Sequence, residues 1–410
     1  MRIAFYVPRA EYLEACPGGA FHISGSGMFI SNMLTGLRER AHKVKIVSRL
    51  DVRDFWRGRL PARLLVAEAA LVRGDMKRFS PDAWIVYASS VQYPDLFGWW
   101  QSPKRYLLLG CEGPVERKVE QLPRPWRGIF GLAHRRSLQR ADDIVVVRPK
   151  IAPRLCADGV PEDRIHILPL AIKPWKWMPC RQEARRALGL PQEAPVILCV
   201  RRFSLPQDNN DPRPAKAEAI IDLIAAFAAL PSNAVLLLVG DGRGRPQAER
   251  MVAELGLEGR IRFAGEVEHE DVKWFYAACD FFAFPDIESN RPYQAFLEAQ
   301  ACGRPVLALQ TSTAELTVKP GRTGLLAKDL EEFQALLLAL AKDRSRCEEL
   351  GRAGPAHVAR SFSIETRVGQ IEELLLGRSA PMDAGIQDSR AMEGRKSGRK
   401  EEAAQVAHVG

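Results

Sequence analysis

One stretch, from Phe281 to Leu309, constrains the fold of this chain of 410 residues more than any other. Phe281 to Phe284 is a short apolar run ended by Pro285, which is typical of a buried strand. Pro292 suits the first position of a helix, because its missing N–H would be unpaired there, and Gly303 stops that helix before a second apolar run. The stretch therefore predicts a strand, a loop, a helix, a turn and a strand, in that order.

The start of the predicted helix indicates a ligand site, because the helix begins just past the carboxyl end of a strand. Ligands of open α/β sheets bind at that edge, and the unpaired N–H groups and positive dipole end of a helix favour phosphate. Glu298 lies two turns into the same helix. Its carboxylate could accept hydrogen bonds from ribose hydroxyls.

Length and composition predict two ordinary domains, since 410 residues with 46% apolar content exceed what one core needs. The formal net charge of +9 favours anionic partners, but the charges are interleaved, as on a soluble basic surface. The eight cysteines stand singly, which indicates buried thiols in a reducing cytoplasm, with neither zinc nor disulfides. With no signal peptide or membrane span expected, the protein should be cytoplasmic, or at most peripheral on the inner membrane face.

Strands alternate with helices in both halves of the chain, which predicts parallel sheets covered by helices on both faces. The strands of the first half are expected at Ile3–Val7, Val44–Val47, Trp84–Tyr87, Tyr106–Leu109 and Ile144–Val147, and its helices at Gly27–Arg40, Leu60–Val72 and Leu132–Arg140. The second half predicts strands at Val196–Val200, Ala234–Val239 and Ile261–Phe263, and helices at Ala217–Leu230, Gln247–Leu255 and Glu270–Ala278. Further helices are expected at Leu325–Leu340, Cys347–Arg360 and Ile364–Leu376.

The proline-rich and poorly periodic passage from Leu168 to Gln192 is expected to link two domains. This divides the chain into residues 1–172, residues 173–360, a helix at 361–378 that returns to the first domain, and a tail at 379–410. The tail is polar and nearly charge-balanced, so we expect it to be disordered.

The second half carries a series of short motifs in a fixed order. They are Val239-Gly-Asp-Gly, Tyr276-Ala-Ala-Cys-Asp-Phe, Leu297-Glu-Ala-Gln-Ala-Cys-Gly-Arg-Pro-Val, Ala314-Glu-Leu and Gly321-Arg-Thr-Gly-Leu-Leu. Together they resemble the retaining glycosyltransferases of family 4, also described as glycosyl transferases group 1. The resemblance covers residues 1–376 and implies an α/β fold of two Rossmann-like domains facing across a cleft, the GT-B fold. It makes the first domain the acceptor side and the second the nucleotide-sugar-binding side.

The resemblance also implies which residues hold the donor. Glu298 matches the glutamate that binds the nucleotide ribose, and Asn290 stands where the family has a second glutamate near the donor sugar. An amide offers hydrogen bonds without charge, so this difference bears on donor choice or on activity; Glu288, two residues away, could substitute. The other donor-binding residues implied are Tyr293, Gln294, Ala295, Gly265 and Val267.

Two basic residues match the family's clamp on the donor diphosphate. Arg202 follows the first strand of the second domain, as in the family. Lys216 stands two residues before the expected lysine position, which Glu218 occupies here. We favour Lys216 because a leaving diphosphate needs compensating positive charge. Glu112 stands in the place of a family histidine near the sugar, where it is either a polar contact or an ordinary surface carboxylate.

A glycine-rich loop before the first helix completes the implied site. Gly25, Ser26 and Gly27 take the position at which the family's backbone approaches phosphate or acceptor, and Gly18-Gly19 is the competing candidate.

The implied reaction moves a sugar from a nucleoside-diphosphate-sugar to an acceptor hydroxyl with retention at the anomeric carbon. The resemblance implies no metal and no cofactor, the donor being a co-substrate; the acceptor would be a sugar, a lipid-linked sugar or a small molecule. Trp99-Trp100 and Trp175-Lys176-Trp177 could touch a membrane surface weakly, although core and linker packing are commoner fates.

Other functions stay open at this level. A nucleotide-sugar epimerase or a non-catalytic nucleotide-sugar binder would share the fold. An NAD-dependent oxidoreductase is disfavoured, because the loop from Val7 to Gly25 is too long for the dinucleotide motif. Nucleic-acid binding is disfavoured because no single element interleaves basic and aromatic residues. No motif specifies the base, the sugar, the acceptor or the oligomeric state.

Overall fold

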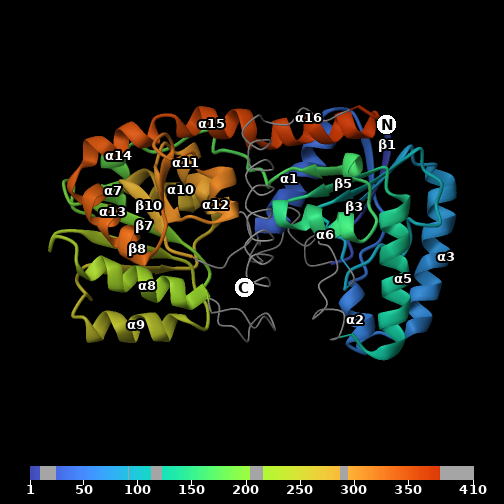
Figure 1. The fold of residues 1–410 in the computed structure, drawn as a ribbon, viewed down its shortest axis with the longest axis horizontal. Coiled ribbons are helices and arrows are strands. Elements are labelled where there is room, and N and C mark those ends of the chain that lie inside the picture. The colour runs from blue at the N-terminus through green and yellow to red at the C-terminus, as the bar shows by residue number, and fades with distance from the viewer. Residues whose placement is uncertain (10–24, 91, 112–121, 204–215, 287–293, 379–410) are drawn as a thin grey trace, which may run out of the picture. The chain divides into compact units, whose positions relative to one another are not determined.

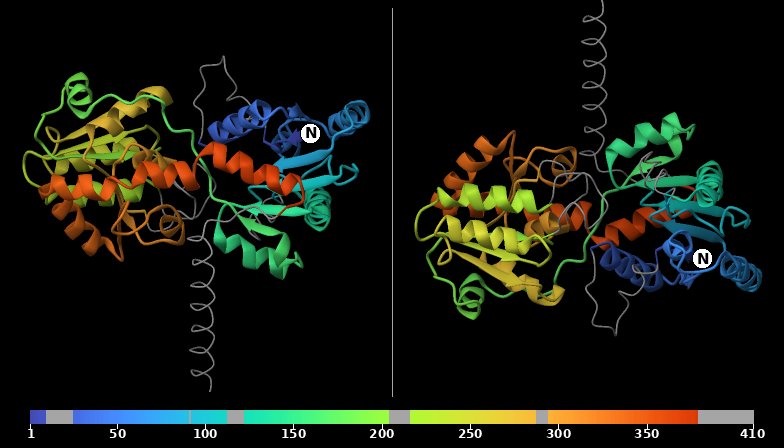
Figure 2. Two further views of the ribbon diagram at one scale, coloured as in Figure 1. Left: turned by 90° about the horizontal axis from the view of Figure 1, so that it is seen from above. Right: turned by 90° about the horizontal axis from the view of Figure 1, so that it is seen from below.

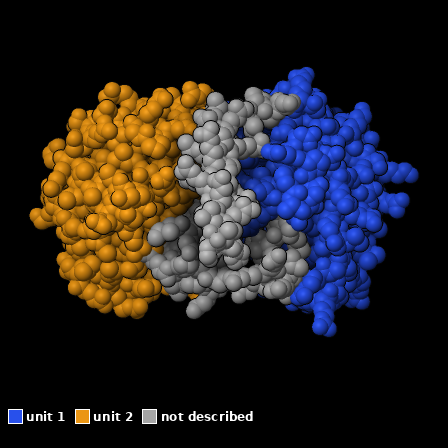
Figure 3. All heavy atoms as spheres, viewed as in Figure 1, with its two compact units in different colours: residues 1–171, 364–410 blue, residues 172–363 orange. Residues whose placement is uncertain are grey.

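The protein divides into two compact units, which Figure 3 colours separately. Our computed structural model describes residues 1–9, 25–90, 92–111, 122–203, 216–286 and 294–378, with side chains except at 25–26 and 216–218. Unit 1 comprises Met1–Ala171 and the segment that starts at Ile364, and unit 2 comprises Ile172–Ser363. The chain therefore passes from one unit to the other twice.

Unit 1 is built on a six-stranded parallel sheet with the order β2-β1-β3-β4-β5-β6 (Figure 1). Its strands are β1 (Arg2–Tyr6), β2 (Lys43–Ile46), β3 (Ala83–Tyr87), β4 (Arg105–Leu109), β5 (Asp143–Val146) and β6 (Ile165–Ile167). Its helices are α1 (Gly25–Glu39), α2 (Val52–Trp56), α3 (Ala62–Phe79), α5 (Arg124–Arg140), α6 (Ala152–Ala157) and α16 (Ile364–Leu375). The apolar side chains of the central strands β1, β3 and β4 are buried, as expected for a parallel sheet covered on both faces.

The last helix of the described chain, α16, belongs to the core of unit 1. It lies beside α1, as Figure 2 shows, and Gly36 of α1 makes the close approach possible. A Cβ at Gly36 would lie 2.7 Å from the side chain of Val368. The Glu372 carboxylate accepts hydrogen bonds from Arg40 at 2.6 Å and lies 3.0 Å from the ring of His42. Packing and charge thus fix α16 to the first half of the chain.

Unit 2 has a second six-stranded parallel sheet with the order β12-β11-β10-β7-β8-β9. Its strands are β7 (Val196–Val200), β8 (Val235–Val239), β9 (Ile261–Gly265), β10 (Phe281–Phe284), β11 (Val306–Leu309) and β12 (Gly324–Ala327). Its helices are α7 (Arg181–Ala187), α8 (Lys216–Ala228), α9 (Arg245–Glu254), α10 (His269–Ala278), α11 (Gln294–Ala301), α12 (Ser312–Thr317), α13 (Leu330–Lys342), α14 (Arg344–Gly351) and α15 (Gly354–Ser361). The direction of strand addition reverses between β7 and β10, so the topological switch point lies there.

These two sheets confirm the predicted α/β fold with two Rossmann-like units. The stretch from Phe281 to Leu309 forms β10, α11 and β11, of which Figure 1 labels β10 and α11. Pro292, the predicted first helical residue, lies outside the described residues, and the described helix begins at Gln294. Where the described ranges allow a search, no helix is long and apolar enough to cross a membrane.

The predicted helix at Leu325–Leu340 is wrong in its first part. Gly324 to Ala327 forms the edge strand β12, which pairs with β11. A Cβ at Gly324 would lie 2.1 Å from the carbonyl oxygen of Val306, so only glycine allows this approach of the two strands. The helix α13 starts after Asp329, whose carboxylate accepts a hydrogen bond from the N–H of Glu332 at 2.9 Å.

The predicted linker also contains a helix, α7, which packs into unit 2. Its residue Arg185 is fully buried and donates to the carbonyl oxygens of Ala278 at 2.8 Å and Ala194 at 2.8 Å. Its guanidinium also pairs with Asp280 at 2.8 Å. Sequence periodicity missed α7 because one of its two buried side chains is charged. The sequence also does not predict the elements α2, α6, β6 and α12.

A buried carboxylate organises the loop that follows β3 in unit 1. Asp95 is fully buried and accepts hydrogen bonds from the indole of Trp84 at 2.9 Å and from the hydroxyl of Tyr106. Its second oxygen accepts the backbone N–H groups of Phe97 and Gly98, each at 2.8 Å. Burial raises the pKa of Asp95, while these donors oppose the rise. The carboxylate is satisfied only because the chain at Gly98 comes close to it.

We expect Gly98→Ala to destabilise unit 1. A Cβ there would lie 2.1 Å from both the Asp95 carboxylate and the Trp84 indole nitrogen, so the network must open. The expected loss of unfolding free energy is about 1–3 kcal/mol, the usual cost of overpacking. Gly128→Ala in α5 is the matched control, because nothing lies within 4 Å of its Cβ position. Urea unfolding should show this control unchanged or stabilised by up to about 1 kcal/mol; equal midpoints for both variants would contradict the expectation.

Candidate functional site

The carboxyl ends of β7, β8 and β9 are held together by backbone hydrogen bonds. The N–H of Arg201 donates to the carbonyl of Val239 at 2.8 Å, and the N–H of Gly240 donates to that of Gly265 at 2.7 Å. Gly240 has φ +123°, and a Cβ there would lie 2.0 Å from the carbonyl oxygen of Arg201. Glycine is therefore required, and it fixes the backbone that carries Arg202.

The two arginines at the end of β7 have different surroundings. The guanidinium of Arg201 lies 5.2 Å from the ring centre of Phe284 and 3.8 Å from the carboxylate of Asp286, at the end of β10. Arg202 is exposed. Arg201 thus joins the two strands at the switch point, while the side chain of Arg202 is open to an anion from solution.

Glu298 is the fifth of the eight residues of α11 and is largely buried, with 12% of its side chain exposed. The hydroxyl of Tyr276 lies 2.9 Å from Oε2 of Glu298 and 3.3 Å from the carbonyl oxygen of Ala295. The Nδ1 atom of His269 lies 3.9 Å from Oε1. Burial raises the pKa of Glu298, whereas His269 and Tyr276 act to lower it. The carboxylate is thus held in one orientation at a cost in desolvation.

Three aromatic residues, Trp175, His269 and Tyr276, lie beside Glu298. The sequence prediction did not include them in the site. Trp175 stacks on His269, with ring centres 5.1 Å apart and planes at 27°. Trp175 also lies 5.8 Å from Tyr276. Its indole N–H is buried and has no hydrogen-bond partner within the described residues. The position of His269 at the start of α10 was the available signal, but nothing in the sequence joins it to Glu298.

The other predicted donor-binding residues lie at the same edge of the unit 2 sheet. Gly265 ends β9 with φ +70°, and Val267 is half-buried against the core of the unit. Gln294 and Ala295 are the first two residues of α11 and are half-buried. The structure thus brings the ends of β7 and β9 and the start of α11 to one edge, where ligands of such sheets bind.

The remaining predicted residues are described only in part or not at all. Lys216 is the first residue of α8, but its side chain is outside the described part of the chain. Gly25, Ser26 and Gly27 form the first turn of α1 in unit 1. Glu112, Asn290 and Tyr293 lie outside the described residues.

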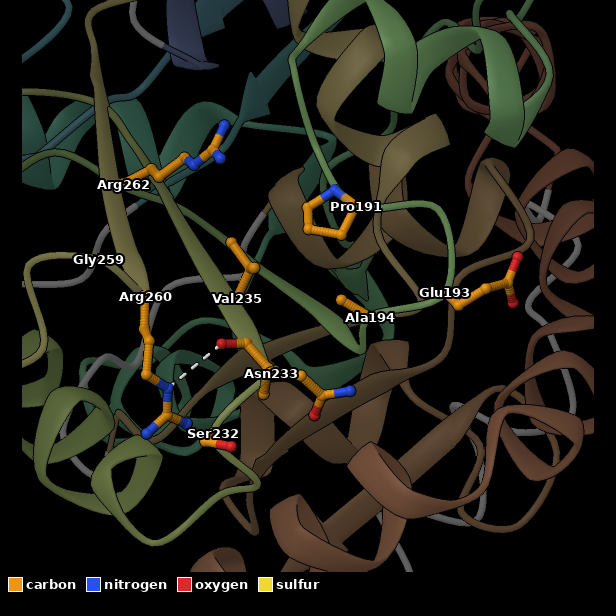
Figure 4. Close-up of a pocket in the computed structure, with 10 residues that line it drawn as sticks. Pro191, Glu193, Ala194, Ser232, Asn233, Val235, Gly259, Arg260 and Arg262 are labelled. Carbon is orange, nitrogen blue, oxygen red and sulfur yellow. Dashed lines mark hydrogen bonds between the residues drawn. The ribbon is translucent and has the colours of Figure 1, made fainter.

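A pocket of about 370 Å³ lies at the opposite edge of the unit 2 sheet, before the starts of β7, β8 and β9 (Figure 4). Two arginines line it. Arg260 donates to the carbonyl oxygens of Leu230 and Pro231, and Arg262 donates to those of Leu188 and Gly189. These cations satisfy backbone groups, so the two arginines have a structural role, and the pocket is separate from the candidate site.

Comparison with known proteins identifies relatives of the second unit. Residues 194–343 match the family model described as glycosyl transferases group 1. The chain is 32% identical over 205 residues to the GDP-mannose-dependent monoacylated alpha-(1-6)-phosphatidylinositol monomannoside mannosyltransferase of Corynebacterium glutamicum, an alignment that covers 48% of this chain and 50% of that protein. The chain spans about half the length of the curated relatives that it matches first.

Solved structures resemble both units. Sucrose-phosphate synthase from Thermosynechococcus elongatus matches with a TM-score of 0.66 and 20% identity, covering 92% of this chain and 99% of that one. The Anabaena protein Alr3699/HepE in complex with UDP and glucose matches with a TM-score of 0.65 and 16% identity, covering 92% and 100%. These likenesses confirm the predicted GT-B fold.

We expect Glu298→Gln to stabilise the protein at neutral pH. Burial raises the pKa of Glu298 above its ordinary value of 4.5, so the folded state holds this proton more tightly than the unfolded chain does. An ionised Glu298 therefore costs stability, and the cost grows as the pH rises through the folded pKa. The amide removes this cost, so the melting temperature should rise at about pH 7.5 and change less at about pH 4.5.

The matched control is Glu258→Gln, which changes an exposed glutamate of the same unit. Differential scanning calorimetry at the two pH values should show a pH-independent melting difference for this control. A gain from Glu298→Gln that is equal at both pH values, or a loss at neutral pH, would contradict the assigned burial cost.

Proposed function

Because residues 194–343 match the family model of the glycosyl transferases group 1, we propose that this chain transfers a sugar from a nucleoside-diphosphate-sugar to an acceptor hydroxyl with retention. One arrangement carries the proposal. An exposed Arg202 on a glycine-fixed backbone and a held carboxylate, Glu298, lie at the carboxyl edge of one sheet. The relative named above is a transferase, which favours transfer over epimerisation or binding alone.

We propose that the unit 2 edge binds the donor. Glu298 accepts hydrogen bonds from the ribose hydroxyls, and Tyr276 orients it by donating to one carboxylate oxygen. Gly265 and Val267 lie toward the base, while Gln294 and Ala295 offer N–H groups at the start of α11. Asn290, which precedes that helix in the sequence, contacts the donor sugar in this proposal.

Catalysis in this proposal rests on positive charge at the leaving diphosphate. Negative charge grows there as the anomeric bond breaks, and Arg202, Lys216 and the helix N–H groups stabilise it without a metal ion. The acceptor proton leaves through the donor phosphate, so no separate base is needed. Glu112 and the first turn of α1, at Gly25, Ser26 and Gly27, then contact the sugar and the acceptor from unit 1.

We further propose a cytoplasmic enzyme that meets a lipid-linked or other glycan acceptor, with peripheral contact to the inner membrane face. The matched Corynebacterium protein acts, by its name, on a phosphatidylinositol mannoside. Its donor is GDP-mannose by name, whereas the Anabaena structure holds UDP, so the base is the first property to measure.

We expect one nucleoside diphosphate among GDP, UDP and ADP to raise the melting temperature. Binding to the folded state alone adds about 2.7 kcal/mol when the ligand is at 100 times its dissociation constant. Glu298→Ala should abolish this shift, because the ribose loses its acceptor. Thermal-shift titration measures both effects, with Glu258→Ala as the control. A full shift retained in Glu298→Ala would remove the ribose assignment.

We expect Arg202→Ala to reduce kcat by about 10²–10³, the usual effect of removing one group that stabilises transition-state charge. Arg202→Lys should recover part of the rate, because it restores the charge without the planar fork. Radiolabelled sugar transfer measures the rate, and Arg250→Ala on the exposed side of α9 is the control. If Arg202→Ala changed the rate no more than this control does, the phosphate role would be wrong.

A further inference from the structure

The helix α3 of unit 1 leaves most of its surface uncovered. Only Val72 and Met76 are buried along its 18 residues. Apolar side chains are instead open to solvent, with Val66 71% exposed, Leu71 68% and Leu64 41%. Isolated exposed apolar residues are ordinary, but several on one helix that packs weakly indicate a surface for another partner.

The helix α5 also exposes apolar side chains, and it carries more positive charge than α3. Ile129 is 51% exposed and Leu132 is 46% exposed, one turn apart on its outer side. The helix contains five arginines and no acidic residue. Its inner side, by contrast, packs Phe130 and Leu138 into the unit. The exposed side of α5 is therefore both basic and apolar.

Sheet topology puts these helices on one face of unit 1. The steps from β2 to β3 and from β4 to β5 cross the sheet in the same direction, so right-handed crossovers place α3 and α5 on the same side. Figure 1 shows both on the side away from α1. The connection from β3 to β4 crosses the same way and carries Trp100, which is 44% exposed. Trp99 beside it lies 5.3 Å from the guanidinium of Arg136 of α5.

The acidic residues of α3, Glu68 and Asp75, do not offset the basic charge of this face, because the same helix carries Arg63, Arg73, Lys77 and Arg78. The carboxylate of Glu68 accepts the hydroxyl hydrogen of Ser48 at 2.6 Å. Asp75 pairs with Lys45 at 2.8 Å and with Arg78 at 2.6 Å. Arg63, Arg73 and Lys77 are exposed on the same helix. The outward charge is therefore positive over both helices.

We propose that the basic-apolar face, made of the exposed sides of α3 and α5 with Trp100, docks on a bilayer that contains anionic lipid. Cations attract the acidic headgroups, and the aliphatic side chains and the indole enter the boundary between headgroups and acyl chains. The proposal gives a surface to the peripheral location proposed above, but it does not depend on the transfer reaction.

Two other occupants fit this face less well. Nucleic acid would find the cations and the one ring of Trp100, but Val66, Leu71 and Ile129 are aliphatic side chains on which no base can stack. A second copy of the chain in a two-fold dimer would bring the same arginines against one another. Of these three occupants, only a lipid surface offers both anionic groups for the cations and an apolar layer for the aliphatic side chains.

Vesicle flotation of the full chain tests the proposal, with phosphatidylcholine vesicles that contain or lack phosphatidylglycerol. The wild type should float with the anionic vesicles and be released by salt. Arg124→Glu with Arg135→Glu should lower the partition coefficient by about tenfold or more. Ile129→Gln with Leu132→Gln should weaken binding to the anionic vesicles with little change in its salt dependence.

A matched pair on unit 2, Arg250→Glu with Leu255→Gln on or just after α9, should float as the wild type does; Leu255 is 43% exposed. Circular dichroism and the melting temperature, measured on the same samples, show whether each variant is folded, and neither measurement depends on the transfer reaction. Equal flotation of wild type and face variants would overturn the proposal. Dimerisation of the wild type that only the face variants lose would also overturn it. RNA binding by the wild type in moderate salt that only the face variants lose would do the same.

Discussion

Unit 2 depends on a buried ion pair that joins the starts of its two central strands. Asp280, directly before β10, accepts the N–H of Val196 at the start of β7 at 2.8 Å and binds the buried guanidinium of Arg185. A buried pair is weak support for stability by itself, because both charges lose water. Here, however, Arg185 also donates to several carbonyl oxygens at the same edge, so its donors are largely used. The pair therefore fixes which strands meet and in what register. Since β7 and β10 flank the switch point, it also sets the far ends that carry Arg202 and lead to α11.

At the opposite edge of the same sheet, the fixed position of the Glu298 carboxylate costs folding free energy before a ligand binds. Glu298 is largely buried beside Tyr276 and His269 and the pKa of its carboxyl is raised, so its charged form is destabilised before any ligand arrives. Tyr276 and His269 compensate in part and fix its direction. A residue whose burial opposes stability is better explained by binding than by folding. The raised pKa and the hydrogen bond from Tyr276 thus support the same interpretation of Glu298.

The sequence predicted most of the strands and the edge at which the candidate site lies, for physical reasons that also explain the errors. Buried parallel strands are continuous apolar runs, so β7, β8 and β10 were evident. The edge strand β12 was missed because Leu325 and Leu326 also fit the spacing of the helix that follows. Glu298 was found from its motif, but its contacts to Tyr276 and His269 join residues more than 20 positions apart, which no local pattern encodes. The roles of the predicted site residues, Glu298 and Arg202 included, stay predictions, and the side chains of Lys216, Glu112 and Asn290 lie outside the described residues.

Because the chain passes between the units twice, the two units have different folding requirements. Unit 2 is one continuous segment, Ile172–Ser363, so all of its core is present once that segment is made. Unit 1 is not, because its core includes Ile364, Val368 and Ile371 of α16. The surface of α1 around Gly36 therefore stays uncovered until unit 2 has been synthesised. Domains generally fold as units from the amino end during synthesis, and here that order cannot complete unit 1 first. The first half of the chain therefore keeps apolar surface exposed until α16, the helix that follows unit 2, completes its core.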